Sequence, residues 1–479
     1  MIWIALALAL AGAFLCMKNW RFGVPIALLG GLLADPVRKI VPGEPVALVL
    51  TPLVLLGLSF LASVMTEGPV RVWAVSLLRE LRPALLMALA WLLCSAALSL
   101  VRYQNPIMTA IGLLSYTAPL PALLLAYRFG LNPARVRHAL LVYLTACTTM
   151  QLGGYFAFLG FEWPLLRQVG EGMVISSQGL TLEAYTGFFR TPEIAAWHAA
   201  TAICLVIVLV TANWVRLPSV ALGLLVLYLL IAGMITGRRK MLAEVALFLA
   251  VYSWLLMRRG GGVGRLLTVI VLTTGIVGFA LVAWTAATPQ LHPYLIRGFT
   301  VFGDAPTRIS DLGISAIVDS VRRFGFLGAG LGVASQGAQH FGSDAVPTYG
   351  VAEGGVGKIT TELGVPGLLI AVWVGLLCVR YAKRMILRLE SAPPQVRRFA
   401  YGVIALLIAN ISTYLVAAQV FGDPFVLLLL GLMVGISLAL QDRHGAPAIP
   451  TKTRRGRRRP VAIARPPRRA LPVHGVVPR

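Results

Sequence analysis

The chain has 479 residues, of which 58% are hydrophobic and 13% charged, and its formal net charge is +24 at pH 7. A soluble domain has too little interior to bury so large an apolar fraction, so the composition excludes a soluble protein and indicates a polytopic membrane protein. Eleven Lys or Arg and one Asp lie in residues 441–479, so much of the positive charge is in the C-terminal tail.

Thirteen apolar segments are predicted as spans, because a helix needs roughly 20 apolar residues to cross a hydrocarbon core ~30 Å thick. They are residues 1–17, 22–34, 46–65, 83–101, 106–127, 139–161, 194–214, 219–236, 241–257, 265–286, 363–380, 400–421 and 424–440. The segment 22–34 is short for a span. The segment 1–17 lacks a basic start and a cleavage region, so we expect a span rather than a cleaved signal. The predicted fold class is an all-α polytopic membrane protein with about 12–13 transmembrane helices and a long extracytoplasmic loop containing short helices.

The spans and the segments between them divide the chain into six parts. They are N-terminal helices over residues 1–161, an outer loop over 162–193, central helices over 194–286, a long outer loop over 287–362, C-terminal helices over 363–440 and a tail over 441–479. The tail is rich in Pro and basic residues, a composition typical of disorder. Anionic lipid headgroups at the cytoplasmic surface explain a basic tail in a membrane protein, so we expect no nucleic-acid partner.

The basic loops orient the chain, because Lys and Arg in short loops mark the cytoplasmic side. If the tail is cytoplasmic, alternation places five further basic segments on that side: residues 18–21, 66–82, 128–138, 258–265 and 381–399. The same alternation places the loops 162–193 and 287–362 outside the cytoplasmic membrane. With 13 spans, the N-terminus also lies outside.

Three adjacent cations, Arg238, Arg239 and Lys240, break this pattern because they fall on the outer side. A basic triplet at the outer end of a span predicts an anion site. The alternative is that these side chains snorkel from two helix ends to the lipid headgroups. Adjacent residues on a helix end do not all face one ligand, so we expect Arg239 to matter more than its neighbours.

The loop 287–362 is too long to be a mere connector. Within it, Ile314, Ile317, Val318 and Val321 have the i, i+3, i+4, i+7 spacing of one helix face. Such a helix is expected to lie on the outer leaflet or to cap a cavity. The glycines of GFLGAGLG that follow predict a tight turn, since a nucleotide-binding loop needs a preceding strand or a GK[ST] sequence.

Two carboxylates lie near the end of this loop. Glu353 lies beside the pair Gly354–Gly355, which lets the backbone bend, and Glu362 comes directly before apolar sequence. Each is predicted either as a site residue or as a structural group. For Glu362 the structural alternative is a charge at a helix N-terminus or a hydrogen-bonded carboxylate.

Three stretches, in this order, resemble motifs of the O-antigen ligase and O-antigen polymerase superfamily. TGFFRTPEIAAWHA, which contains Arg190, resembles the outer-loop motif that leads into a span. ITGRRKMLAEV resembles the Thr-x-Ser-Arg-Gly turn, with Arg239 at the arginine position. The stretch from Arg308 through ELGVPGLLI resembles the Arg-led long-loop segment, with Glu362 at the span entrance.

The resemblance, which covers roughly residues 186–380, implies a membrane glycosyltransferase of the cytoplasmic membrane. Members of the family take a glycan from a polyprenyl diphosphate lipid at the outer face and pass it to a saccharide or glycolipid acceptor. The predicted site residues are Glu353, Arg239 and Arg308 as catalytic groups, and Arg238, Lys240, Arg190 and Glu362 as substrate-binding groups. The family usually has His nine residues before the span-entrance Glu, and this chain has Glu353 there.

Residue chemistry agrees with this implication. Arg forms bidentate, charge-assisted bonds to phosphate oxygens and stays protonated. The outer loops show no DxD-type acidic pair, so we expect a reaction without metal or other cofactor, with Arg in the place of the metal. Glu353 is expected to deprotonate or orient the acceptor hydroxyl.

Two other classes of function remain open on the sequence alone. One is a transporter of polysaccharide or lipid, although the spans hold almost no charges apart from Glu244. The other is a non-catalytic scaffold that binds polysaccharide assembly proteins, with the basic tail as a docking segment. Convergence of Arg239, Arg308 and Glu353 on one cavity would favour the enzyme. The sequence does not separate a ligase from a polymerase.

Overall fold

The structure is a computed structural model that describes residues 2–169, 174–177, 180–259, 263–287, 293–294, 297–298, 303, 305–336 and 353–444. The predicted disorder of the tail beyond residue 444 lies outside these residues. Residues 441–444, which we assigned to the tail, are the last residues of a helix.

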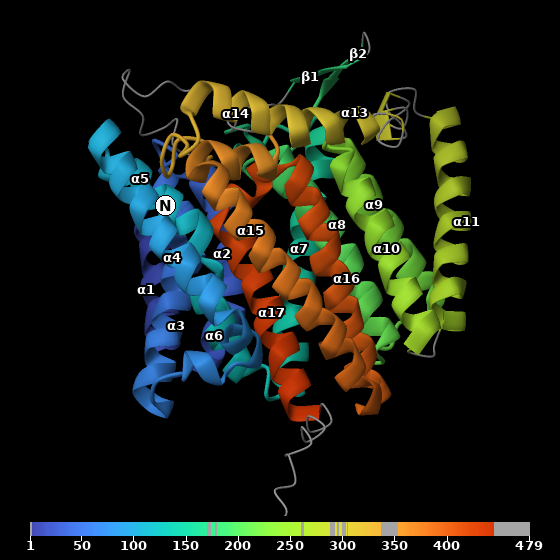
Figure 1. Cartoon of the computed structure of the whole chain (residues 1–479). Helices are drawn as coiled ribbons and strands as arrows, with labels where there is room; N and C mark the ends of the chain where they lie inside the picture. Colours follow the sequence, from blue (N-terminus) through green and yellow to red (C-terminus); the bar gives the residue numbers. More distant parts are fainter. Residues whose placement is uncertain are drawn as a thin grey trace, which may run out of the picture. The chain divides into compact units, whose positions relative to one another are not determined.

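Helices dominate the described residues (Figure 1). The longer ones are α1 (Ile2–Lys18), α2 (Trp20–Ile40), α3 (Thr51–Glu67), α4 (Ser76–Tyr103), α5 (Pro106–Thr117), α6 (Pro119–Phe129), α7 (Pro133–Phe158), α8 (Pro192–Thr211), α9 (Ser219–Ile235), α10 (Lys240–Arg259), α11 (Val263–Ala287), α15 (Gly355–Arg388), α16 (Pro394–Val416) and α17 (Pro424–His444). Short 3-10 turns include η1 (Val46–Leu50) and η8 (Ala418–Gly422). An antiparallel hairpin joins β1 (Val174–Ser177) to β2 (Leu180–Glu183), with Ile175 opposite Leu182.

Each of the thirteen predicted segments overlaps one α-helix or, for residues 106–127, the pair α5 and α6. The segment 46–65 also includes η1, and the segment 400–421 includes most of η8. Eight stretches of the described residues are long and apolar enough to cross a membrane. They are Val46–Glu67, Ser76–Tyr103, Pro106–Phe129, Pro192–Thr211, Lys240–Arg259, Gly355–Ser391, Pro394–Val416 and Pro424–His444. Among the others, α1 and α9 have 17 residues each, and α2 contains Asp35, Arg38 and Lys39. The all-α membrane class is therefore confirmed, with fewer qualifying spans than we predicted.

Helix α8 is the centre of the bundle. Its apolar stretch is wholly buried, and it packs against α7, α9, α10 and α16. Local signals fix its start: the Thr191 side chain accepts a hydrogen bond from the backbone N–H of Ile194, Pro192 occupies the first turn, and Glu193 complements the helix dipole there. This start places residues 190–193 at one end of the bundle.

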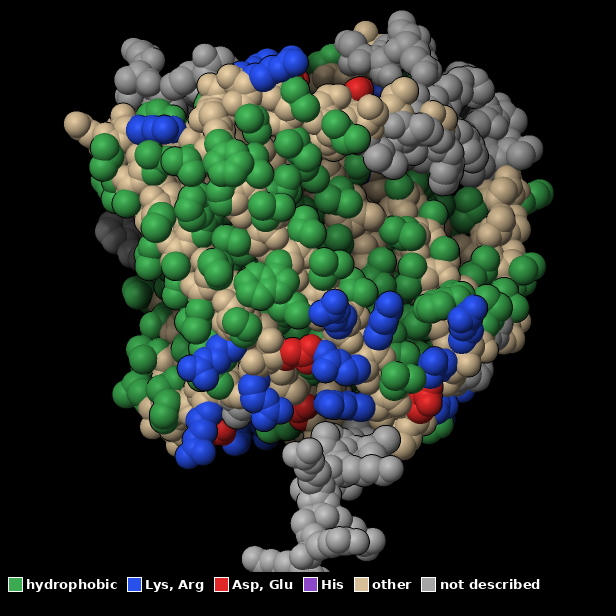
Figure 2. Space-filling view, in the orientation of Figure 1, with side chains coloured by type: hydrophobic (Ala, Val, Ile, Leu, Met, Phe, Trp, Pro, Cys, Tyr) green, Lys and Arg blue, Asp and Glu red, His purple; other side chains and the backbone are tan. Residues whose placement is uncertain are grey.

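Small residues allow α17 to pack closely on α6. A Cβ on Gly431 or Gly435 would lie 2.4 Å or 2.3 Å from the backbone oxygen of Pro119 or Leu123. Small residues at helix contacts are typical of membrane proteins, where close packing replaces the hydrophobic effect between helices. In Figure 2, apolar side chains cover most of the visible face, and Lys and Arg gather toward its lower end. Exposed apolar residues such as Leu89 and Leu93 of α4 belong to this outer surface.

The long loop contains the short helices that we predicted. They are α13 (Ala305–Ser310), a π-helical turn η5 (Asp311–Ser315) and α14 (Ala316–Phe324), which lie across the upper end of the bundle in Figure 1. On α14, Ser320 faces the protein and its hydroxyl lies 3.0 Å from that of Thr361. Two residues of the predicted apolar face point outward, since Ile314 is 74% exposed and Val318 is 40% exposed, whereas Ile317 and Val321 are partly buried.

Glycines then form the predicted turn between α14 and α15. Gly328 and Gly364 both have positive φ. A Cβ on Gly328 would lie 2.6 Å from the backbone nitrogen of Gly364, and a Cβ on Gly364 would lie 2.3 Å from the backbone oxygen of Phe326. The N–H of Ala329 donates to the carbonyl of Thr361 at 2.7 Å. From α4, Arg102 donates to the carbonyl of Gly328 at 2.8 Å. The glycine turn therefore joins α4 to α15.

Glu362 lies directly before the apolar part of α15, where the sequence placed it. Helix α15 begins at Gly355, eight residues earlier than the predicted span, but its backbone is not helical at Gly364, so two helices meet there. Glu362 is two residues before this break, at the end of the first, short helix.

Candidate functional site

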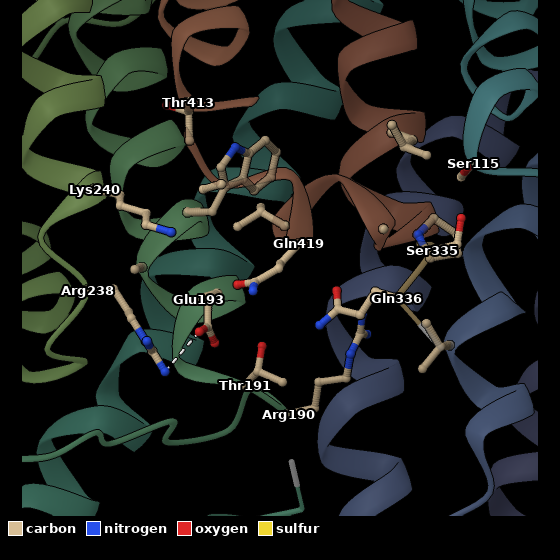
Figure 3. A pocket seen from close by; sticks show the side chains of 18 of the residues that line it. Ser115, Arg190, Thr191, Glu193, Arg238, Lys240, Ser335, Gln336, Thr413 and Gln419 are labelled. Carbon is tan, nitrogen blue, oxygen red and sulfur yellow. Dashed lines mark ion pairs between the residues drawn. The ribbon is translucent and has the colours of Figure 1, made fainter. Parts of the chain in front are cut away.

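A cavity of about 890 Å³ opens among the ends of several helices (Figure 3). The residues that line it come from η1, α5, the starts of α8, α10 and α17, the end of α16, η8 and the long loop. Six of the seven predicted site residues line this cavity: Arg190, Arg238, Arg239, Lys240, Arg308 and Glu353. The seventh, Glu362, does not appear among the lining residues.

The basic triplet forms one wall. Gly237, with φ of +67°, turns the chain after α9, and α10 begins only at Lys240. Because the triplet occupies a turn rather than a regular helix, Arg238, Arg239 and Lys240 all line the cavity, contrary to our expectation for adjacent residues. That the triplet binds an anion remains a prediction.

Two further arginines and two carboxylates complete this wall. Arg297, which the sequence analysis did not select, donates to the Gly237 carbonyl at 2.9 Å, and Arg308 reaches in from α13. Arg238 pairs with Glu193 at 2.8 Å (Figure 3). Among the described residues of this wall, five cations therefore face two carboxylates, Glu193 and Glu353. Five cations that line one wall suit a polyanionic group.

Glu353 forms ion pairs with two of these cations. Its Oε1 lies 3.1 Å from Lys240 Nζ and 3.3 Å from Arg308 Nη1. Partial burial pushes the pKa of Glu353 upward, but the charges of Lys240 and Arg308 outweigh burial and hold this pKa below its usual range. A carboxylate with a low pKa is a weak base at neutral pH. The geometry therefore favours a role in positioning the two cations over the predicted role as proton acceptor.

Arg190 belongs to the opposite side of the cavity in Figure 3. Its guanidinium donates to Asp35 at 3.1 Å and to Asp423 at 2.7 Å, and both carboxylates are buried. Burial acts to lower the pKa of Arg190, but Asp423 and Asp35 outweigh it and raise this pKa. Arg190 thus joins the loop before α8 to α2 and to the start of α17. Its charge is balanced, which favours a structural role over the predicted contact with substrate.

Glu362 is fully buried and satisfied within the protein. It accepts hydrogen bonds from the hydroxyls of Tyr116 and Ser335, both at 2.8 Å, and from the N–H of Ala334 at 3.2 Å. These contacts match the structural alternative for Glu362, a hydrogen-bonded carboxylate, and connect α15 to α5.

Apolar residues form another part of the cavity lining, which we call the apolar wall. Val46, Val49 and Leu50 of η1 line it, together with Ile107 and Ile111 of α5. Leu50 and Ile107 are also 39% and 53% exposed on the outside of the protein. The cavity therefore offers both a strongly cationic surface and an apolar surface that continues to the exterior. The sequence analysis did not find this wall, because its residues resemble any other part of an apolar span.

The chain matches no protein-family model, and no curated protein matches it. Its function is therefore inferred from its residues and their arrangement.

Proposed function

We propose that the protein is a membrane glycosyltransferase that moves a glycan from a polyprenyl diphosphate carrier to a sugar acceptor in surface polysaccharide assembly. The observation that carries this proposal is the single cavity with a cationic wall and an apolar wall. Such a cavity suits an amphiphile with an anionic headgroup and a long apolar chain. The resemblance of residues 186–380 to O-antigen ligases and polymerases supports the same substrate class.

The diphosphate is the leaving group in this proposal. Arg239 and Arg308 bind its oxygens, and bidentate bonds from guanidinium groups stabilise the charge that develops as the glycosyl bond breaks. Lys240 and Arg238 contribute further positive charge, and Glu353 and Glu193 hold these side chains toward the cavity. The reaction needs no metal ion, because fixed cations supply the charge stabilisation.

The cavity also bears on the two other classes of function. Arg239, Arg308 and Glu353 converge on it, which a scaffold alone does not require. The lining residues lie at helix ends, whereas transporter sites lie near the bilayer midplane. Both observations support an enzyme that acts at a membrane surface.

Reconstitution tests the proposal directly. The purified full chain in lipid vesicles should transfer glycan from a defined polyprenyl diphosphate glycan to a saccharide, a glycolipid or a second lipid-linked glycan, with chelator present. The acceptor that is used separates a ligase from a polymerase. Absence of transfer to every acceptor, together with absence of donor binding, would refute the proposal.

The proposed orientation places the long loops outside the cytoplasmic membrane and the C-terminal tail inside, with about 12–13 spans. In a background without native cysteines, Ser310→Cys on α13 should react with an impermeant thiol reagent in intact cells or spheroplasts. Ser391→Cys, after α15, should react only after permeabilisation. Both serines are exposed, so accessibility is matched. The reverse labelling pattern would overturn the orientation.

Glu353→Gln should leave the pH dependence of transfer unchanged between about pH 6 and pH 8. The physical reason is that Glu353 has a lowered pKa and is ionised throughout this range. Its ion pairs are complete above the ordinary carboxyl pKa and are lost as the pH falls through the lowered value. The expected change is a weaker affinity for donor, measured as a higher KM, because Lys240 and Arg308 lose their partner. If the wild-type pH–rate profile shows a titration near neutral pH and this variant lacks it, Glu353 is the base.

A further inference from the structure

A buried carboxylate at the inner side of the cavity is not explained by anion binding. Glu244 lies one turn after Lys240 on α10, lines the cavity and is 1% exposed. An ionisable residue inside a membrane-spanning helix is costly, so it is kept on a cavity or paired with partners and is a functional hypothesis by default. Trp197 of α8 and Thr413 of α16 line the cavity beside it.

Neutral groups hold this carboxylate. Asn410 Nδ2 donates to Oε1 at 3.3 Å, and the Thr413 hydroxyl donates to Oε2 at 3.4 Å. Asn410 is itself fixed by Trp197, whose Nε1 donates to Oδ1 at 2.7 Å. The carboxylate is therefore oriented from two neighbouring helices.

Glu244 differs in this respect from the other two carboxylates of the cavity. Among the described residues, Glu193 and Glu353 each form ion pairs with cations of the basic wall, and no ion pair within 4.0 Å is found for Glu244. Cations that pair with a carboxylate oppose its protonation, and Glu244 has only neutral donors at that distance. It is thus the carboxylate of this cavity best arranged to take up a proton.

The titratable groups around Glu244 are few. Tyr143 of α7 and Cys204 of α8 are close enough to interact electrostatically with Glu244. Lys240 lies one turn before Glu244 on α10. Asn410 and Thr413, which face it from α16, do not titrate. Tyr and Cys at their ordinary pKa values of about 10 and 8.5 are mostly neutral at pH 7.

We infer that Glu244 is the proton acceptor of the transfer reaction, an inference that rests on the proposed function. The acceptor hydroxyl oxygen bonds to the anomeric carbon of the donor glycan, and the bond from that carbon to the diphosphate oxygen breaks. The hydroxyl proton passes to the Glu244 carboxylate, directly or through one water, and the diphosphate leaves with the bonding electron pair on the basic wall. After the reaction the proton is on Glu244 and the negative charge of the leaving group is at the basic wall, within the same cavity.

Glu244→Gln is the first test, because Gln keeps the size of the side chain and an oxygen that accepts from Asn410 or Thr413. Single-turnover transfer should fall by about 10²–10⁴-fold, the usual contribution of a general base, while donor binding and thermal stability in detergent stay at wild-type values. A structural role alone predicts near wild-type transfer for this variant, and that result would overturn the inference. Glu353→Gln is the comparison variant; because its expected defect is a weaker affinity for donor, it should lose far less at saturating donor.

Thr413→Val supplies a second measurement that does not depend on Glu244→Gln folding normally. Removing a donor to the charged carboxylate should move the acid limb of the pH–rate profile of transfer to higher pH. An unchanged limb in this variant would argue against Glu244 as the titrating group. If the proposed function itself is wrong, the result differs from this one, since wild-type protein would then transfer no glycan at any pH.

Discussion

Arg239→Ala and Arg308→Ala should each reduce glycan transfer by about 10²–10³-fold, because each removes one fixed donor to the leaving diphosphate. Loss of one such donor costs about 2.7–4 kcal/mol in transition-state stabilisation in comparable oxyanion sites. The measurement is kcat/KM with a defined polyprenyl diphosphate glycan in vesicles. Arg→Lys at either position should also impair turnover, since a Lys keeps the charge but loses the planar fork.

Arg322→Ala is a suitable control for these variants. Arg322 lies exposed on α14 in the same loop as Arg308, and it is not among the residues that line the cavity. Transfer should stay close to wild type. Wild-type transfer by both Arg239→Ala and Arg308→Ala would remove the diphosphate assignment. The two neighbours of Arg239 also line the cavity, so Arg238→Ala and Lys240→Ala should produce measurable losses rather than none.

Arg190→Ala should have the largest effect on stability. It leaves Asp35 and Asp423 without the cation that they share, and breaking a buried ion pair by removing one partner typically costs about 3–5 kcal/mol. The midpoint of thermal unfolding in detergent should fall strongly. The loss should be smaller in the double variant Arg190→Met with Asp423→Asn, because a full negative charge is removed together with the positive one.

The comparison between Arg190→Ala and Arg239→Ala separates structure from chemistry. Arg239→Ala should unfold near the wild-type temperature while losing activity. If Arg190→Ala keeps both wild-type stability and wild-type donor affinity, the structural assignment of Arg190 is wrong. If it keeps stability but loses donor affinity, Arg190 binds substrate as the resemblance implies.

Apolar segments predicted the helices well, because the length and hydropathy of a span are properties of contiguous sequence. Hydropathy did not predict the first part of α15, from Gly355 to the break at Gly364, because this part holds Lys358 and Glu362. The pattern of basic loops singled out the basic triplet, and the family resemblance singled out Arg308. They did not distinguish Arg190 from these, because its partners Asp35 and Asp423 are 155 and 233 residues away.

Partners far apart in sequence also determine the roles of the carboxylates. Glu362 and Glu353 have similar sequence settings, yet one is enclosed by neutral donors from α5 and the glycine turn, and the other pairs with two cations. Glu244 was visible in the sequence as a rare charge within a span. Its contacts with Asn410 and Thr413 of α16 required the tertiary structure.

The contact of the glycine turn with α4 and α15 has a consequence for biosynthesis. Arg102 of α4 is synthesised 226 residues before Gly328, to which it donates, and at about 5–20 residues per second that interval lasts roughly 10–45 s. The α15 contact, from Thr361 to Ala329, follows later still. For most of this time the residues of the apolar wall, from η1 and α5, have been synthesised and Arg308 has not. The nascent chain therefore acquires its apolar wall before its cationic wall, so a chain that ends before Arg308 lacks part of the proposed donor site.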